Sequence, residues 1–127
     1  MAGDSSAKCQ KDEALMRRYF AKLVELRAHE CYGMTFFIFD FTAKTVQQIN
    51  TDGSGQEAGF TGFKYKEDRR ELLFVVNGDI EETKIHEISE EFAANLMREE
   101  NWQRLCYGLS IKSQKTIDWL VKAGIEG

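Results

Sequence analysis

The segment at residues 34–41, with the sequence MTFFIFDF, constrains the fold more than any other part of the chain. Apolar side chains occupy both alternating faces of this segment, and aromatic rings dominate it. A strand of this kind is covered on both faces, as in the middle of a sheet. The run is also far shorter than the ~20 apolar residues that a membrane helix needs. We therefore expect a central strand with packing layers on both sides.

Four more segments read as strands, and one of their connections carries a strong turn signal. The pair Asn77-Gly78 directly follows the apolar run at 71–76, and both residues tolerate the positive φ of a type I′ hairpin turn. Residues 51–59 are rich in Gly and Ser, so we expect a loop there. The strands are predicted at residues 44–50 (polar, nearer an edge), 60–65, 71–76 and 80–88.

Helices are predicted at both ends of the chain. From Asp12 to Leu26 the apolar residues recur at spacings of three and four, which favours an amphipathic helix that ends before Gly33. Ser89, followed by two glutamates, is a good N-cap for a second helix. A short helical piece is expected from Asn101 to about Gly108. The last helix is expected to follow Ser110 or Ser113, to face inward with Ile117, Leu120 and Val121, and to stop at Gly124.

Together these elements predict an α+β fold. We expect a mostly antiparallel sheet of about five strands, packed by an N-terminal helix and two or three C-terminal helices. A chain of 127 residues has the length of one domain, because separate domain cores usually need roughly 100 residues each. Residues 1–10 are expected to be a flexible leader, and residues 11–127 a single domain.

Composition narrows the class of protein and its compartment. The chain has 17 basic and 21 acidic residues, a net charge of −4, which argues against general nucleic-acid binding. The polar start lacks the apolar segment of a signal peptide. Three cysteines, an odd number, favour a reducing environment. We therefore expect a cytoplasmic protein with no membrane partner.

The charge is unevenly distributed along the sequence. Residues 79–100 contain eight acidic and two basic side chains. A surface of this density would steer a basic partner, and a tryptophan beside it would serve as an apolar anchor. The alternative is an ordinary solvated surface. The candidate partner-binding residues are Asp79, Glu81, Glu82, Glu87, Glu90, Glu91 and Trp102.

Asp40 is the best single catalytic candidate. It shares a strand face with Met34, Phe36 and Ile38, and a carboxylate among apolar side chains can act as a general acid or base. The alternative is that Asp40 marks the point where the strand meets water. The aromatic residues likewise either line an apolar pocket or fill the core.

Other constellations point to no cofactor or metal. His29 and Cys31 do not have the spacing of a zinc site. The glycine-rich loop after Asp52 lacks the lysine and the following helix of a phosphate-binding loop. The basic residues Lys64, Lys66, Arg69 and Arg70 are interrupted by two acids.

These observations favour binding over catalysis. The leading hypothesis is a non-catalytic protein-binding module, of the immunity or adaptor kind, whose acidic face meets a basic protein. The alternative is a small-molecule-binding protein or small enzyme with an aromatic, sheet-lined pocket and Asp40. A homodimer paired through the polar strand at 44–50 is a third hypothesis.

Overall fold

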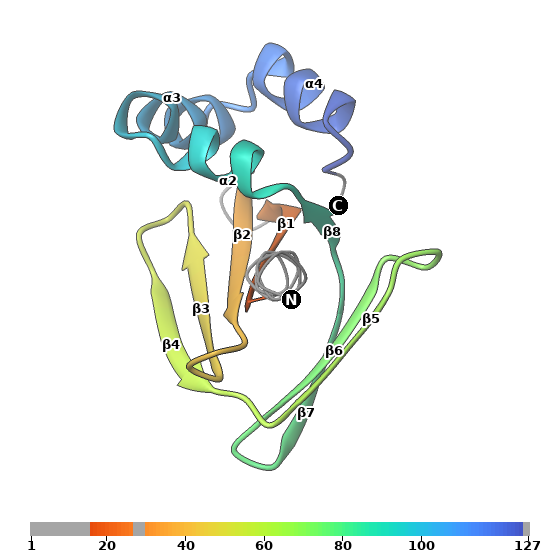
Figure 1. Ribbon diagram of the computed structural model, residues 1–127. Coiled ribbons are helices and arrows are strands. Elements are labelled where there is room, and N and C mark those ends of the chain that lie inside the picture. The colour runs from red at the N-terminus through yellow and green to blue at the C-terminus, as the bar shows by residue number, and fades with distance from the viewer. Residues whose placement is uncertain (1–15, 27–29, 126–127) are drawn as a thin grey trace, which may run out of the picture.

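A computed structural model describes residues 16–26 and 30–125, and in these ranges two antiparallel sheets and a group of helices are layered on one another (Figure 1). The larger sheet, in spatial order, contains β4 (Gly55–Gly59), β3 (Thr45–Asn50), β2 (Cys31–Asp40), β1 (Arg17–Leu26) and β8 (His86–Ile88). The smaller sheet contains β5 (Gly62–Lys66), β6 (Glu71–Val76) and β7 (Asp79–Lys84). The helices are α2 (Glu90–Met97), α3 (Glu99–Ser110) and α4 (Gln114–Lys122).

Strand β2 lies at the centre of the larger sheet and is covered on both faces. Met34 and Phe36 point toward the helices, whereas Phe37 and Phe39 point toward the smaller sheet. All four side chains are buried. The prediction of a central strand between two packing layers is confirmed, because only such a position buries the apolar side chains on both faces of the strand.

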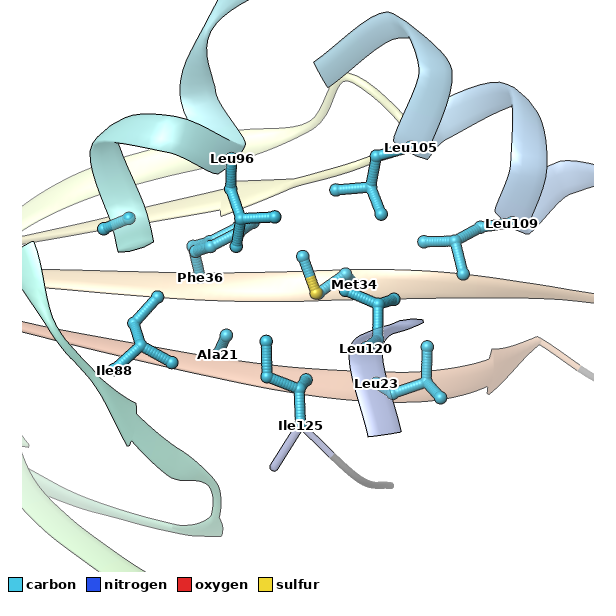
Figure 2. Close-up of a cluster of buried hydrophobic side chains, with 11 residues drawn as sticks. Ala21, Leu23, Met34, Phe36, Ile88, Leu96, Leu105, Leu109, Leu120 and Ile125 are labelled. Atoms are coloured by element: carbon cyan, nitrogen blue, oxygen red, sulfur yellow. The ribbon is translucent and has the colours of Figure 1, made fainter. Parts of the chain in front are cut away.

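The first core lies between the larger sheet and the helices, as Figure 2 shows. Leu105 and Leu109 of α3 and Leu120 of α4 are fully buried in one cluster with the sheet residues Leu23 and Met34. The contribution of each fully buried leucine is about 1.5–3 kcal/mol by area. The remaining members of this core are Ala21, Phe36, Ile88, Ala93, Leu96 and Ile125.

The second core lies between the two sheets and is largely aromatic. Phe39 is at its centre, with ring centroids 4.9–5.7 Å from four other phenylalanines in edge-on arrangements that the ring quadrupole favours. These four are Phe20, Phe60, Phe63 and Phe74. The aromatic residues of this cluster therefore fill the space between the sheets.

The prediction of an N-terminal helix over residues 12–26 is wrong from Arg17 onward. Arg17–Leu26 is the long strand β1, paired with β2 from Arg17↔Asp40 to Leu26↔Cys31 and with β8 on its other side. A strand between two neighbours, with cores on both faces, shows no clean alternation of apolar and polar residues. Its apolar residues therefore resemble a helical pattern. The proposed leader, residues 1–10, and the start of the expected helix lie outside the described residues.

Three other boundaries differ from the sequence expectations. Residues 55–59, expected in a loop, pair with β3 as the edge strand β4. The strand expected at 80–88 is divided into β7 and β8, which belong to different sheets. Helix α3 begins at Glu99 rather than at Asn101. In α4, Leu120 is buried but Val121, expected to face inward, is exposed.

Several local signals are confirmed. Asn77 and Gly78 have φ angles of 53° and 82° and connect β6 to β7. The hydroxyls of Ser89 and Ser113 accept hydrogen bonds from the backbone N–H groups of Phe92 and Thr116. Each of these signals depends only on its immediate neighbours in the sequence.

A polar cluster connects the two sheets at the junction between β7 and β8. The Tyr65 hydroxyl donates to the carbonyl of Ile85 (3.2 Å) and accepts from the backbone N–H of Glu87 (3.3 Å). The Arg18 guanidinium donates two hydrogen bonds of 2.7 and 2.8 Å to the Glu87 carboxylate and lies over the Phe63 and Tyr65 rings. The hydrogen bond to Glu87 raises the pKa of Arg18 above its usual value.

We expect Tyr65 to make stability depend on pH in the alkaline range. Burial raises the pKa of Tyr65 above its usual 10.0, because the phenolate is disfavoured there. Its contribution is therefore complete below pH 10 and is lost as the pH rises through the raised pKa. Urea unfolding measured between pH 8 and 11.5 should show a smaller alkaline loss for Tyr65→Phe than for wild type. Tyr107→Phe, at an exposed tyrosine, is the control, and an identical loss in both variants would contradict the assignment.

Candidate binding groove

Helices α3 and α4 approach each other closely at Gly108. This glycine is buried, and a Cβ atom added to it would lie 2.9 Å from the Cβ of Thr116 and would collide with the Thr116 hydroxyl. Real Cβ atoms do not approach one another so closely, so any larger residue would push the helices apart. The position thus requires glycine in the last turn of α3, although inside a helix glycine costs about 1 kcal/mol relative to alanine.

A groove of about 420 Å³ runs beside this contact. Its volume is within the range of binding sites for small molecules or side chains. The three large apolar side chains of its lining are exposed: Tyr107 (67%), Ile111 (55%) and Trp119 (41%). Its complete lining is Asn101, Arg104, Tyr107, Gly108, Ile111, Ser113, Lys115, Thr116 and Trp119.

The groove is lined by the sides of α3 and α4 that do not pack on the sheet. Leu105, Leu109 and Leu120 point toward the sheet (Figure 2). Tyr107 on α3 and Ile111 at the C-cap of that helix, four residues later, therefore lie on a side that the sheet does not cover. Trp119 contacts the ring of Phe92 in α2, with centroids 6.3 Å apart. That contact orients the indole at the groove while leaving part of it exposed.

The charge of the groove is positive. Arg104 comes from α3 and Lys115 from α4, and both side chains are exposed. The lining residues include no carboxylate within the described part of the chain. The groove thus combines an apolar floor (Tyr107, Ile111 and Trp119) with one cation from each helix.

Cys106 on α3 is half-buried beside these residues. Burial raises the pKa of its thiol above the usual value, so the thiol form predominates at neutral pH. A nucleophilic cysteine normally has the opposite shift. Nothing about Cys106 therefore suggests covalent chemistry at the groove.

Asp40 lies in a second groove, of about 430 Å³, at the open end of the helix-covered face of the larger sheet. One of its carboxylate oxygens accepts hydrogen bonds of 3.0 Å from the backbone N–H groups of Thr42 and Ala43, and the other lies 3.8 Å from Arg17. The two backbone hydrogen bonds fix the turn between β2 and β3. The aromatic cluster around Phe39 packs against the opposite face of the sheet, so the structure does not bring Asp40 together with the rings of that cluster.

The acidic candidates do not gather on one face. Glu81 is opposite Phe74 and Glu82 is opposite Leu73 in the register of β6 and β7, so their side chains leave opposite faces of the smaller sheet. Glu87 is paired with Arg18. Glu90 lines the groove that contains Asp40. The exposed candidates are Asp79, Glu81 and Glu82 on β7, and Glu90 and Glu91 in the first turn of α2.

Trp102 is half-buried and belongs to the first core. Its ring lies 5.5 Å from that of Phe36, so the side chain packs on the sheet. Trp119, rather than Trp102, is the more exposed tryptophan at a groove. The sequence does not distinguish the two tryptophans, but it offers one signal that apolar residues of α3 remain exposed. The end of α3 and its C-cap have more apolar residues than one inward face can hold, since Leu105 and Leu109 alternate with Tyr107 and Ile111.

Comparisons and metal chemistry add no assignment. Across residues 16–26 and 30–125, no group of three or more His, Cys, Asp or Glu side chains is placed to hold a metal ion. None of the helices in the same ranges is long and apolar enough to span a membrane. No protein-family model matches the chain, and no curated protein or solved structure is significantly similar to it.

Proposed function

We propose that the protein is a non-catalytic protein-binding module, of the adaptor or immunity kind, and that the α3–α4 groove is its docking surface. The observation that supports this most directly is the exposure of Tyr107, Ile111 and Trp119 around one groove. Large apolar residues gathered on a surface indicate a protein–protein or ligand contact. Tryptophan and tyrosine are the residues most enriched among those that dominate binding energy.

A catalytic function has less support from the same geometry. The groove has an amide, hydroxyls and two cations, but none of its lining residues in the described ranges is a histidine, a cysteine or a carboxylate. General acid–base and nucleophilic catalysis commonly rely on such groups. The groove is therefore better suited to binding.

We expect the matched pair Ile111→Ser and Ile80→Ser to distinguish docking at the groove from non-specific binding by exposed apolar residues. Both isoleucines are exposed, but Ile80 lies on β7 and is not among the groove residues. Tagged wild type and both variants are used as bait in host lysate, and the captured protein is purified and titrated by calorimetry. Ile111→Ser should weaken binding at least about fivefold, and Trp119→Ala about thirtyfold, because central truncations cost about 1–2 kcal/mol or more.

If the partner docks at the groove, Ile80→Ser should leave the affinity within twofold of wild type, whereas a loss in Ile80→Ser without a loss in Ile111→Ser would point to the edge of β7 instead. Equal affinity of Ile111→Ser, Trp119→Ala and wild type for the captured protein would place the docking surface elsewhere and overturn the proposal. The circular dichroism of each variant verifies that the fold is retained.

A second candidate surface for a basic partner is the edge of β7, where the exposed Asp79, Glu81 and Glu82 accompany Ile80. Within the described residues, β7 has a neighbour only on its β6 side. Such an edge accepts an added strand through main-chain hydrogen bonds, and carboxylates favour a basic one. The same charges also repel acidic or identical strands, which is a common way of protecting an edge.

The bait experiment also tests this edge. Glu81→Lys with Glu82→Lys should abolish capture of a basic partner. Glu67→Lys with Asp68→Lys changes the net charge equally, at the exposed turn between β5 and β6. This control pair should leave capture of the basic partner unchanged. Capture that is unaffected by the β7 pair would count against a binding role for this edge.

A further inference from the structure

We infer that the α3–α4 groove accepts an amphipathic helix of a partner protein, one that carries carboxylates on both sides of its apolar stripe. This inference rests on the proposed function and adds the shape and charge of the partner. It comes from three features of the groove: which backbone groups are available, how the apolar residues are spaced, and where the cations lie.

The backbone of the groove favours a helix over a strand. Its walls are α3 and α4, whose N–H and C=O groups are engaged in their own helices along most of their length. A strand binds by adding hydrogen bonds to an open sheet edge, and helix walls offer no such edge. A helix needs no backbone partner and inserts only its side chains, so it fits a groove between two helices.

The spacing of the apolar residues points the same way. Tyr107 is in the last turn of α3 and Ile111, four residues later, is the C-cap of that helix, while Trp119 lines the groove from α4. A bound helix presents apolar side chains at positions i, i+3 or i+4, and i+7, which repeat at about the same distance along its axis. Two or three such side chains would cover the apolar floor.

The cations set the charge of the partner. Arg104 is on α3 and Lys115 is on α4, so positive charge comes from both walls of the apolar floor. Lys112, in the connection between the helices, is also exposed. A helix with acidic residues flanking its apolar stripe would place carboxylates near both walls, whereas a basic helix would meet like charge there.

A nucleic acid is disfavoured as the occupant, although aromatic and basic residues coincide in the groove. Binding to phosphates requires several cations, and the lining supplies two. Glu99 and Glu100 lie in the first turn of α3, and the chain has a net charge of −4. A polyanion would be repelled by this surrounding charge, but a short amphipathic helix with a few carboxylates would interact with the groove alone.

Two synthetic helices provide the test. Each has about 14 residues with leucine at i, i+3/i+4 and i+7; one has glutamate and the other lysine at the flanking positions. The readout is the NMR signal of the Trp119 indole N–H, assigned with Trp119→Phe, with the signal of the half-buried Trp102 as internal reference. The glutamate peptide should shift the Trp119 signal at lower concentration than the lysine peptide. Its affinity should fall as salt rises.

Charge reversal of the groove should reverse this preference. Arg104→Glu with Lys115→Glu should weaken the glutamate peptide about tenfold, since each exposed pair is worth roughly a few-fold in affinity, and should strengthen the lysine peptide. Lys64→Glu with Arg69→Glu makes the same change in net charge at exposed positions outside the groove. It should leave both affinities within twofold of wild type. If the charge-reversed pair disturbs the fold, Arg104→Gln with Lys115→Gln replaces it. This neutral pair should weaken the glutamate peptide by about half as much on the free-energy scale.

The possible results separate this inference from the proposed function. Equal binding of both peptides at Trp119 overturns the charge preference but leaves docking at the groove intact. Tighter binding at Trp119 of a single-stranded oligonucleotide than of either peptide overturns the assignment of a protein helix. If neither peptide shifts the Trp119 signal, the inference fails, whereas the bait comparison of Ile111→Ser with Ile80→Ser decides the proposed function independently.

Discussion

Phe39→Ala is expected to lower the free energy of unfolding by about 3–5 kcal/mol, the cost of deleting a buried phenylalanine side chain. Phe39 is 0% exposed and lies between the two sheets, in contact with rings from both of them. Its removal leaves a cavity lined by rigid rings, which cannot close over it without breaking their edge-on contacts. Small domains have only about 5–15 kcal/mol of net stability. The variant should therefore be close to unfolding at 37 °C.

Urea unfolding followed by circular dichroism measures this effect, and Phe41→Ala is its matched control. Phe41 stacks on Phe39 with centroids 6.3 Å apart but is only half-buried. Its truncation should cost clearly less, because water can occupy the space that it leaves. Equal losses for the two variants would mean that the two sheets are not joined through Phe39.

Gly108→Ala is expected to destabilise the protein by about 1–2 kcal/mol, although alanine is the better helix former by about 1 kcal/mol. The added methyl group would collide with Thr116, and overpacking of this kind typically costs about 1–3 kcal/mol or more. Separation of α3 from α4 would also move Trp119 relative to Tyr107. Partner binding at the groove should therefore weaken together with stability.

The double variant with Thr116→Ala isolates the collision. Removing the Thr116 hydroxyl and methyl eliminates two of the three shortest contacts that the new Cβ would make. The combined loss should then be smaller than the sum of the two single losses. Additive losses, or an increase in stability for Gly108→Ala alone, would show that the helices are not held at this distance by the glycine.

The features of the fold that could be predicted from the sequence are those with local causes. The Asn77-Gly78 turn, the caps at Ser89 and Ser113 and the doubly apolar strand β2 each depend on a few adjacent residues. Strand β1 could not be recognised in this way. Phe20 is buried in the core between the two sheets, whereas Ala21 and Leu23 are buried in the core beneath the helices. Apolar residues that are buried on two faces of a strand have the same sequence spacing as the apolar residues of an amphipathic helix. Edge strand β4, with the sequence GQEAG, has no apolar pattern and is defined by its pairing with β3.

The candidate groove could not be predicted because exposure depends on which surfaces remain uncovered after packing. In sequence, Trp102 and Trp119 are equivalent apolar residues on predicted helices. Only the packing of α3 and α4 on the sheet places Trp102 against Phe36 and leaves Trp119 at the surface. The acidic residues failed to form one face for a similar reason, since neighbours on a strand alternate in direction and β7 and β8 belong to different sheets.

The position of β8 has a consequence for how the protein is made on the ribosome. Strands β1 to β4 form a continuous meander that is complete once Gly59 has left the exit tunnel, but β1 receives its second neighbour only when His86–Ile88 emerges. At a synthesis rate of about 5–20 residues per second, the nascent chain spends roughly one to six seconds with that side of β1 unpaired. During this interval the unpaired backbone N–H and C=O groups of β1 can form hydrogen bonds with strands of other nascent chains. The ion pair of Arg18 with Glu87 forms only when this edge closes, so it marks the end of the vulnerable interval.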